Sequence, residues 1–292
     1  MARERSGSVG ADLSLLAVTA IWGLTFPAIQ RALAAVTPLS FVTARFGLAA
    51  LVLLLLFPRR SLRVSWRAFA VSALLGLWLA AGTILQTTGL LHTTASKSGF
   101  ITGLYVVLVP LFGLVVSRIL PPWTSVVAVL LAAAGLYLLT SPGGAEFNVG
   151  DVLTLGCAVA FALHIVTAAR AAPRHDAVLL AFWQIATAAV LCGAAMLAVE
   201  TPRFPVTAWT LFALLLTGVL ATAFAFVVQM WAQRRTSATH VAVIFTAEPV
   251  FAALFARLIQ HDVLGPTGFI GAVLILAGIL LSQMSSQRPR SQ

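Results

Sequence analysis

Long apolar runs alternate with short polar or proline-containing breaks along the whole chain. Each run holds about twenty residues, the length that an α-helix needs to cross a hydrocarbon core of roughly 30 Å. Runs of this length are not the alternating segments of a β-barrel, so helices are the expected spanning elements. We therefore predict ten transmembrane helices, at residues 12–34, 38–57, 67–90, 94–117, 122–140, 150–170, 177–198, 207–232, 238–260 and 265–284.

The second half of the chain repeats the first. The third to fifth runs align with the eighth to tenth at a constant spacing of 143 residues, with identical pairs that include Gln86/Gln229, Thr93/Thr236, Phe112/Phe255 and Gly135/Gly278. The first two runs align with the sixth and seventh at a spacing of 139, as in Asp12/Asp151. Each half has five helices, an odd number, so the second half enters the membrane from the opposite face.

Inverted repeats of this kind are typical of secondary transporters, whose substrate site lies near the membrane midplane between the halves. The sequence predicts an all-α membrane protein with a first five-helix repeat at 1–140, an inverted second repeat at 150–284 and a cytoplasmic tail at 285–292. A central cavity is expected between the repeats. A duplicated bundle with a purely structural role is the alternative.

Composition agrees with a membrane protein. Apolar residues make up 60% of the chain and charged residues 9%, whereas a soluble protein carries about 25% charged residues. The lipid bilayer is therefore an expected partner. Cys157 and Cys192 lie inside apolar runs and are interpreted as packing residues, so we expect no disulfide, no metal site and no cofactor.

The net charge of +10 reflects membrane topology rather than nucleic-acid binding. No basic stripe is evident, because the arginines are spread over the breaks between runs. Thirteen of the 18 lysines and arginines fall on one predicted side and four on the other, and Arg45 lies within the second run. The positive-inside rule therefore predicts that both termini are cytoplasmic.

Polar and aromatic side chains at midplane depth are the candidates for substrate binding. At 1.5 Å of rise per residue, the midplane lies about ten residues from each helix start. The repeat-related Gln86 and Gln229 are also expected to face inward, as gates or as interhelical contacts. The candidate set is Trp22, Phe26, Trp78, Gln86, Tyr105, Phe161, His164, Trp183, Gln184, Gln229 and Glu248.

Glu248 is the most informative of these residues. A carboxylate at mid-bilayer costs at least roughly 2.5–3.5 kcal/mol, so it should face a cavity or a partner. It would bind a substrate ammonium group or couple transport to protons; otherwise it is held beside the carbonyl freed by Pro249. We interpret Arg45 as structural, with a side chain that snorkels outward or pairs internally.

An enzyme is not expected, and no catalytic residue is assigned. The five histidines are scattered, and no spacing resembles a metalloprotease motif or a serine-nucleophile elbow. A carrier of phosphorylated sugars would favour several deep cations, and only Arg45 is clearly deep. A cationic drug or another sugar-type metabolite stays open as an alternative substrate class.

Four segments carry a family resemblance: AIWGLTFPAIQ (20–30), TARFGLAAL (43–51), TTASKSGFITGLYVVLVPLFG (93–113) and TSATHVAVIFTAEPVFAALFA (236–256). With the ten spans and the repeat, the chain resembles the EamA-type drug/metabolite transporters over essentially its whole length. Within them it is most similar to the bacterial aromatic amino-acid exporters of the YddG type. This resemblance implies alternating-access export of aromatic or neutral amino acids, or similar small amphipathic metabolites, across a bacterial inner membrane. The exact substrate, proton coupling and the choice between a monomer and a weak homo-oligomer stay open.

Overall fold

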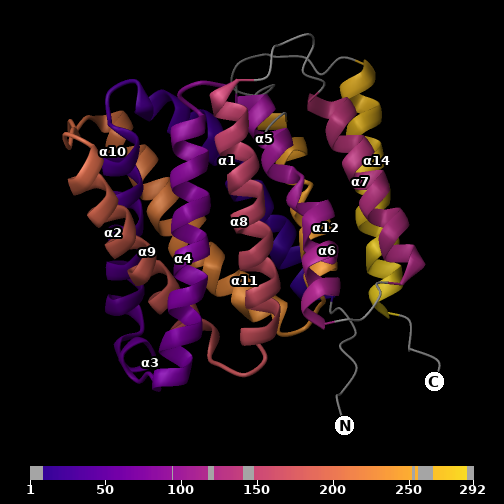
Figure 1. The fold of residues 1–292 in the computed structure, drawn as a ribbon, viewed down its shortest axis with the longest axis horizontal. Coiled ribbons are helices and arrows are strands. Elements are labelled where there is room, and N and C mark those ends of the chain that lie inside the picture. The colour runs from indigo at the N-terminus through magenta and orange to yellow at the C-terminus, as the bar shows by residue number, and fades with distance from the viewer. Residues whose placement is uncertain are drawn as a thin grey trace.

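The protein is built from helices that run side by side (Figure 1). A computed structural model describes residues 9–93, 95–117, 122–140, 148–251, 254–255 and 266–287, and all regular structure within these ranges is helical. The named elements are α1 (Val9–Leu33), α2 (Pro38–Leu56), α3 (Pro58–Leu62), α4 (Trp66–Gly89), α5 (Ala95–Gly103), α6 (Tyr105–Ser117), α7 (Trp123–Thr140), α8 (Val149–Ala171), α9 (Ala177–Val199), α10 (Ala208–Leu215), the π-helical segment η1 (Leu216–Phe224), α11 (Ala225–Gln233), α12 (Ala238–Phe245) and α14 (Pro266–Gln287).

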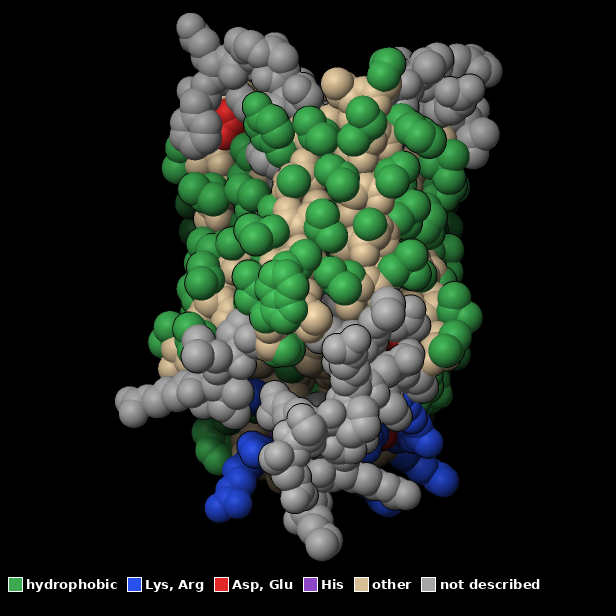
Figure 2. Space-filling view, turned by 90° about the vertical axis from the view of Figure 1, so that its right-hand side faces the viewer, with side chains coloured by type: hydrophobic (Ala, Val, Ile, Leu, Met, Phe, Trp, Pro, Cys, Tyr) green, Lys and Arg blue, Asp and Glu red, His purple; other side chains and the backbone are tan. Residues whose placement is uncertain are grey.

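Six of the described helices are long and apolar enough to cross a membrane: α1, α2, α4, α8, α9 and the continuous segment Ala208–Gln233. Shorter apolar helices cover Ile101–Val115, Trp123–Leu138, Ala238–Phe251 and Pro266–Leu281. Apolar side chains cover the middle of the face formed by α7 and α14, and lysine and arginine side chains gather below it (Figure 2). The predicted all-helical, apolar fold is confirmed, while ten crossings in two inverted halves remain a prediction.

Helix starts follow local capping signals. The Asn148 side chain accepts hydrogen bonds from the backbone N–H groups of Gly150 (2.8 Å) and Asp151 (3.2 Å), and the Asp151 carboxylate accepts one from Asn148 N. Asp176 caps α9 in a similar way, and Pro38 occupies the first turn of α2. These caps satisfy N–H groups that have no partner within the helix. The capping residues stand in the polar breaks between the apolar runs, so the helices begin where the runs begin.

Two of the predicted spans are interrupted at equivalent places. Leu104 separates α5 from α6, and a turn at Thr246–Ala247 separates α12 from a helical segment that begins at Glu248. The backbone N–H groups of Thr246 and Ala247 donate three residues back, to Val243 and Ile244. Pro249 has no N–H with which to continue the ladder. Leu104 and Ala247 differ by the 143-residue spacing of the repeat.

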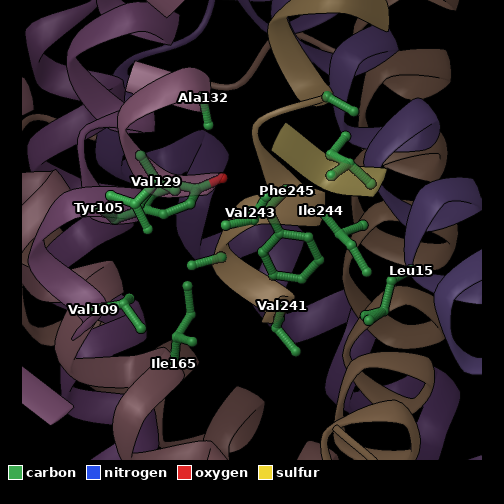
Figure 3. Close-up of a cluster of buried hydrophobic side chains, with 14 of the residues drawn as sticks. Leu15, Tyr105, Val109, Val129, Ala132, Ile165, Val241, Val243, Ile244 and Phe245 are labelled. Carbon is green, nitrogen blue, oxygen red and sulfur yellow. The ribbon is translucent and has the colours of Figure 1, made fainter. Parts of the chain in front are cut away.

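The buried core contains two large clusters and two smaller ones. The first large cluster joins α1, α6, α7, α8, α11, α12 and α14 and contains Leu15, Tyr105, Ile165 and Phe245 (Figure 3). The second joins α2, α4, α9, η1 and α11 around Phe46 and other apolar side chains. Trp22 and Phe161 pack against both clusters. Their shared position directs attention to the space between the clusters.

Candidate substrate-binding cavity

A cavity opens where the two clusters meet. It contains about 750 Å³ of space, part of which is open to solvent. Helices α1, α2, α4, α5, α6, α8, α11 and α12 contribute to its wall, together with Leu90 and Glu248 beside them. The lining residues are Trp22, Thr25, Phe26, Ile29, Arg45, Leu79, Thr83, Gln86, Leu90, Thr102, Tyr105, Phe161, His164, Ile165, Phe226, Gln229, Phe245 and Glu248.

Most of the residues that the sequence selects lie in this wall. Eight of the eleven candidates meet there although they come from five different helices and the segment after α12. They are Trp22, Phe26, Gln86, Tyr105, Phe161, His164, Gln229 and Glu248. Their role in binding remains a prediction, but the structure brings them together around one space.

Three candidates lie outside the cavity wall. Leu79, Thr83 and Gln86 form the cavity side of α4. Trp78 precedes Leu79 on the helix, so it lies on a different side and does not line the cavity. Trp183 donates its indole N–H to the Ser61 carbonyl (2.8 Å), away from the wall. Gln184 lies behind the wall, where its Oε1 is 2.7 Å from His164 Nε2. Among the described residues, Gln184 is linked to the cavity wall through that histidine.

Aromatic rings form an interlocked part of the wall. The ring centroids of Trp22 and Phe245 are 4.8 Å apart at 66°, and those of Trp22 and Phe226 are 6.0 Å apart at 48°. His164 meets Phe226 edge-on at 5.7 Å. The sequence analysis missed Phe226 and Phe245, yet each lies three residues before a predicted site residue, Gln229 and Glu248. That helical spacing was the available signal.

The cavity contains one basic and one acidic side chain, Arg45 and Glu248. Arg45 Nε donates to Thr222 Oγ1 at 2.7 Å, which leaves its terminal Nη groups without a hydrogen bond among the described residues. Within the same ranges, the Glu248 carboxylate makes no hydrogen bond or ion pair, although the two charges are close enough to interact electrostatically. Of the two alternatives expected for Arg45, internal pairing agrees with its hydrogen bond to Thr222, whereas outward snorkelling does not, because the side chain lines the cavity.

Amide groups add hydrogen-bonding capacity to the wall. Gln86 Nε2 donates to Thr102 Oγ1 (3.1 Å), and Gln229 Nε2 donates to Gln233 Oε1 (3.3 Å). Gln229 Oε1 is buried and has no partner among the described residues. Leaving a buried acceptor without a hydrogen bond costs free energy. A ligand donor or a water molecule that bonds to Gln229 Oε1 would therefore bind favourably there.

The described residues offer no metal-binding group. No cluster of three or more histidine, cysteine or acidic side chains occurs among them. Cys157 and Cys192 are buried and not joined to each other. The wall offers ring faces for stacking together with acidic, basic and amide groups for hydrogen bonding.

Comparisons with known proteins agree with this architecture. The profile of the EamA-like transporter family matches residues 9–141 and 148–284. An uncharacterized transporter of Archaeoglobus fulgidus is 35% identical over 284 residues, covering 96% of this chain and 89% of the relative. The uncharacterized transporter YoaV of Bacillus subtilis is 26% identical, with 94% and 97% covered.

Similarity to a solved structure extends over the whole chain. One crystal structure superposes with a TM-score of 0.80 at 20% sequence identity, covering 99% of this chain and 100% of the other. At that identity it shows the fold alone. The family profile matches both halves of the sequence and nearly all of its length, so this chain belongs to the EamA-like transporter family.

Proposed function

We propose that this membrane transporter exports aromatic and other neutral amino acids, or similar small amphipathic metabolites, by alternating access. Membership of a transporter family and relatives named as transporters support transport rather than catalysis. The likeness to exporters of the YddG type supplies the direction and the substrate class, both of which remain predictions.

The substrate assignment depends on one observation: Arg45 and Glu248 line the same cavity, together with several aromatic rings. A zwitterionic amino acid has one carboxylate and one ammonium group. The guanidinium fork matches a carboxylate in geometry and charge, and the Glu248 carboxylate complements an ammonium group. The rings of Trp22, Phe226 and Phe245 offer a surface for an aromatic or apolar side chain.

The two charges also argue against other substrate classes. A cationic drug would be attracted by Glu248 but repelled by Arg45, whose own charge it would leave without a partner. Phosphate recognition favours several cations, whereas the described cavity wall contributes a single arginine. A zwitterion satisfies both Arg45 and Glu248 and leaves neither charge opposed.

Alternating access follows from the predicted inverted repeat. The family profile matches the two halves separately, and the helix interruptions before Tyr105 and Glu248 keep the repeat spacing. Such a repeat gives two related conformations that open a midplane site to opposite sides. The lysines and arginines gathered at one end of the apolar face (Figure 2) support cytoplasmic termini in a bacterial inner membrane.

Counterflow in proteoliposomes tests the proposal. Liposomes loaded with unlabelled phenylalanine should accumulate labelled L-phenylalanine and L-threonine saturably, but not glucose, with and without a pH gradient. Phenethylamine and 3-phenylpropanoate each lack one charged group, so each should compete at least about tenfold more weakly than phenylalanine. Protein-free liposomes are the control. Movement of glucose, or of neither amino acid, would remove the substrate assignment.

A further inference from the structure

The π-helical segment η1 holds two cavity side chains at once. It interrupts the apolar helix Ala208–Gln233 at Leu216–Phe224. Trp22 donates its indole N–H to the carbonyl of Ala221 at 2.8 Å. The next residue, Thr222, accepts the Nε–H of Arg45 at 2.7 Å. Two adjacent residues of η1, Ala221 and Thr222, therefore hold Trp22 and Arg45, and both of these side chains line the cavity.

The π-helical geometry explains why the Ala221 carbonyl receives the indole. In an α-helix, the N–H of Ala225 would donate to Ala221, four residues back. Here it donates instead to Leu220, five residues back, and to Thr222. Ala221 therefore has an acceptor position that the Ala225 N–H does not use. π-Helical turns inside α-helices are frequently found at functional sites.

Close packing of α2 against η1 brings Arg45 within reach of Thr222. A Cβ atom added to Gly218 would lie 3.0 Å from Leu48 Cδ2 and 3.2 Å from the Arg45 carbonyl oxygen. Those separations are tighter than ordinary van der Waals contact, so the absence of a side chain at Gly218 lets the two backbones approach. Thr222 is itself fully buried, at 0% exposure, which shields the Arg45–Thr222 hydrogen bond from water.

We propose that Thr222 is a positioning residue for substrate recognition. This inference rests on the proposed function, in which Arg45 binds the substrate carboxylate. An arginine side chain has several rotatable bonds and loses free energy when it is ordered. Thr222 anchors the inner Nε of the guanidinium, and the two outer Nη groups then face the cavity as a fork for the carboxylate. The orientation exists before the substrate arrives, which lowers the cost of binding.

The role is confined to the carboxylate end of the substrate. Thr222 contacts Arg45 and contributes no lining surface to the cavity. Loss of its hydroxyl should weaken ligands that have a carboxylate and leave a ligand without one unaffected. General damage to the helix would instead weaken both kinds of ligand together.

The test compares Thr222→Val, which keeps the side-chain shape but removes the acceptor, with Thr222→Ser, which keeps the acceptor. Thr217→Val is the matched control, because Thr217 is a buried threonine of the same π-helical segment whose hydroxyl donates to Ala213 O (2.7 Å). The readouts are the KM and maximal rate of phenylalanine counterflow and the inhibition constant of phenethylamine. Size-exclusion chromatography and the thermal midpoint monitor folding.

Thr222→Val should raise the KM for phenylalanine about tenfold, in line with one misplaced charged hydrogen bond. Its inhibition constant for phenethylamine should stay within about twofold of the wild type, by the same arithmetic. Thr222→Ser and Thr217→Val should both resemble the wild type in both values. An unchanged KM in Thr222→Val, or an equal loss for both ligands, would overturn the positioning role.

The proposed function fails in a different pattern. If Arg45→Gln abolishes phenylalanine counterflow while Thr222→Val leaves it unchanged, the zwitterion site stands and only the positioning role falls. If the wild-type protein moves no phenylalanine, the substrate assignment is refuted, and the role of Thr222 is refuted with it. Should Thr222→Val fail to fold, the Thr222→Ser and Thr222→Ala variants carry the same comparison.

Discussion

Exchanging each charged cavity residue for a neutral amide provides a stringent test of the zwitterion site. Glu248→Gln keeps the size of the side chain and removes its charge, and Arg45→Gln replaces the guanidinium with a shorter, neutral polar group. In the structure each faces the cavity with unused hydrogen-bonding positions. Phenylalanine, phenethylamine and 3-phenylpropanoate provide the matching changes on the ligand.

The magnitude follows from one charged hydrogen bond in each case. Such bonds contribute about 1.5–3 kcal/mol, which corresponds to a loss of about 10- to 150-fold in apparent affinity for phenylalanine. The two analogues also test whether each substitution strengthens or weakens binding. 3-Phenylpropanoate has no ammonium group and meets only repulsion from Glu248. Glu248→Gln should therefore strengthen its binding while weakening that of phenylalanine, and Arg45→Gln should do the same for phenethylamine.

Competition against labelled phenylalanine in proteoliposomes measures all of these combinations. Both variants remove one member of a pair of partly buried, interacting charges, and loss of one partner of a buried pair destabilises some proteins by several kcal/mol. Thermal midpoints in detergent must therefore be recorded beside the transport data. The crossed pattern distinguishes recognition from instability, because a poorly folded variant loses affinity for every ligand.

One result would refute the reasoning directly. If Glu248→Gln weakens phenylalanine and 3-phenylpropanoate by the same factor, Glu248 does not bind the ammonium group. An equal loss of phenylalanine and phenethylamine in Arg45→Gln would remove the carboxylate site in the same way. The cavity would then recognise its substrate through its rings and amides alone.

Three smaller predictions follow from the packing. Gly82→Ala should raise the KM for phenylalanine more than that for threonine, because the new Cβ would overlap the Phe161 ring and must displace it from its place in the cavity wall. Trp183→Phe should transport phenylalanine like the wild type, since its indole bonds a backbone carbonyl outside the wall; a large loss would mean that the cavity extends further. Asp12→Ala should lower the thermal midpoint in detergent, because it removes a buried contact of 3.0 Å with His240 worth about 1.5–3 kcal/mol; an unchanged midpoint would contradict this.

Helix positions could be predicted from the sequence because their causes are local. The run at 150–170 corresponds to α8 (Val149–Ala171), and the run at 177–198 to α9 (Ala177–Val199). In each case a capping side chain stands just before the helix, and a polar segment follows. Hydrophobic length and capping are properties of neighbouring residues, so no knowledge of tertiary contacts was needed.

The direction in which a candidate side chain points could not be predicted from the sequence. Trp183 and Gln184 are close to the predicted midplane, yet Trp183 points toward Ser61 and Gln184 toward His164. Membrane helices are apolar around most of their circumference, so the amphipathic pattern that orients a soluble helix is nearly missing. Direction is then decided by which helices pack together, as α4 does with α8 and α9.

Arg45 and η1 show a second limit. Arg45 and Gln184 differ by the 139-residue spacing of the first two runs, yet Arg45 lines the cavity and Gln184 lies behind its wall. No proline breaks the segment Leu216–Phe224, and its sequence reads as an ordinary apolar helix. Its π-helical turn accompanies contacts with Trp22 and Arg45, which lie far away in the sequence. Sequence patterns report local preferences, so a distortion of this kind escapes them.

The helix interruptions lie at the wall of the cavity, and each depends on the other. A break in a transmembrane helix leaves backbone groups without partners, and hydrocarbon offers none, so breaks are tolerated only against protein or a water-filled space. Both described breaks satisfy this condition. Thr102 and Tyr105 flank the first, Phe245 and Glu248 flank the second, and all four line the cavity. The departure from regular helix thus occurs where solvent or substrate can satisfy the backbone, and it sets Glu248 beside the space that a substrate ammonium group would occupy.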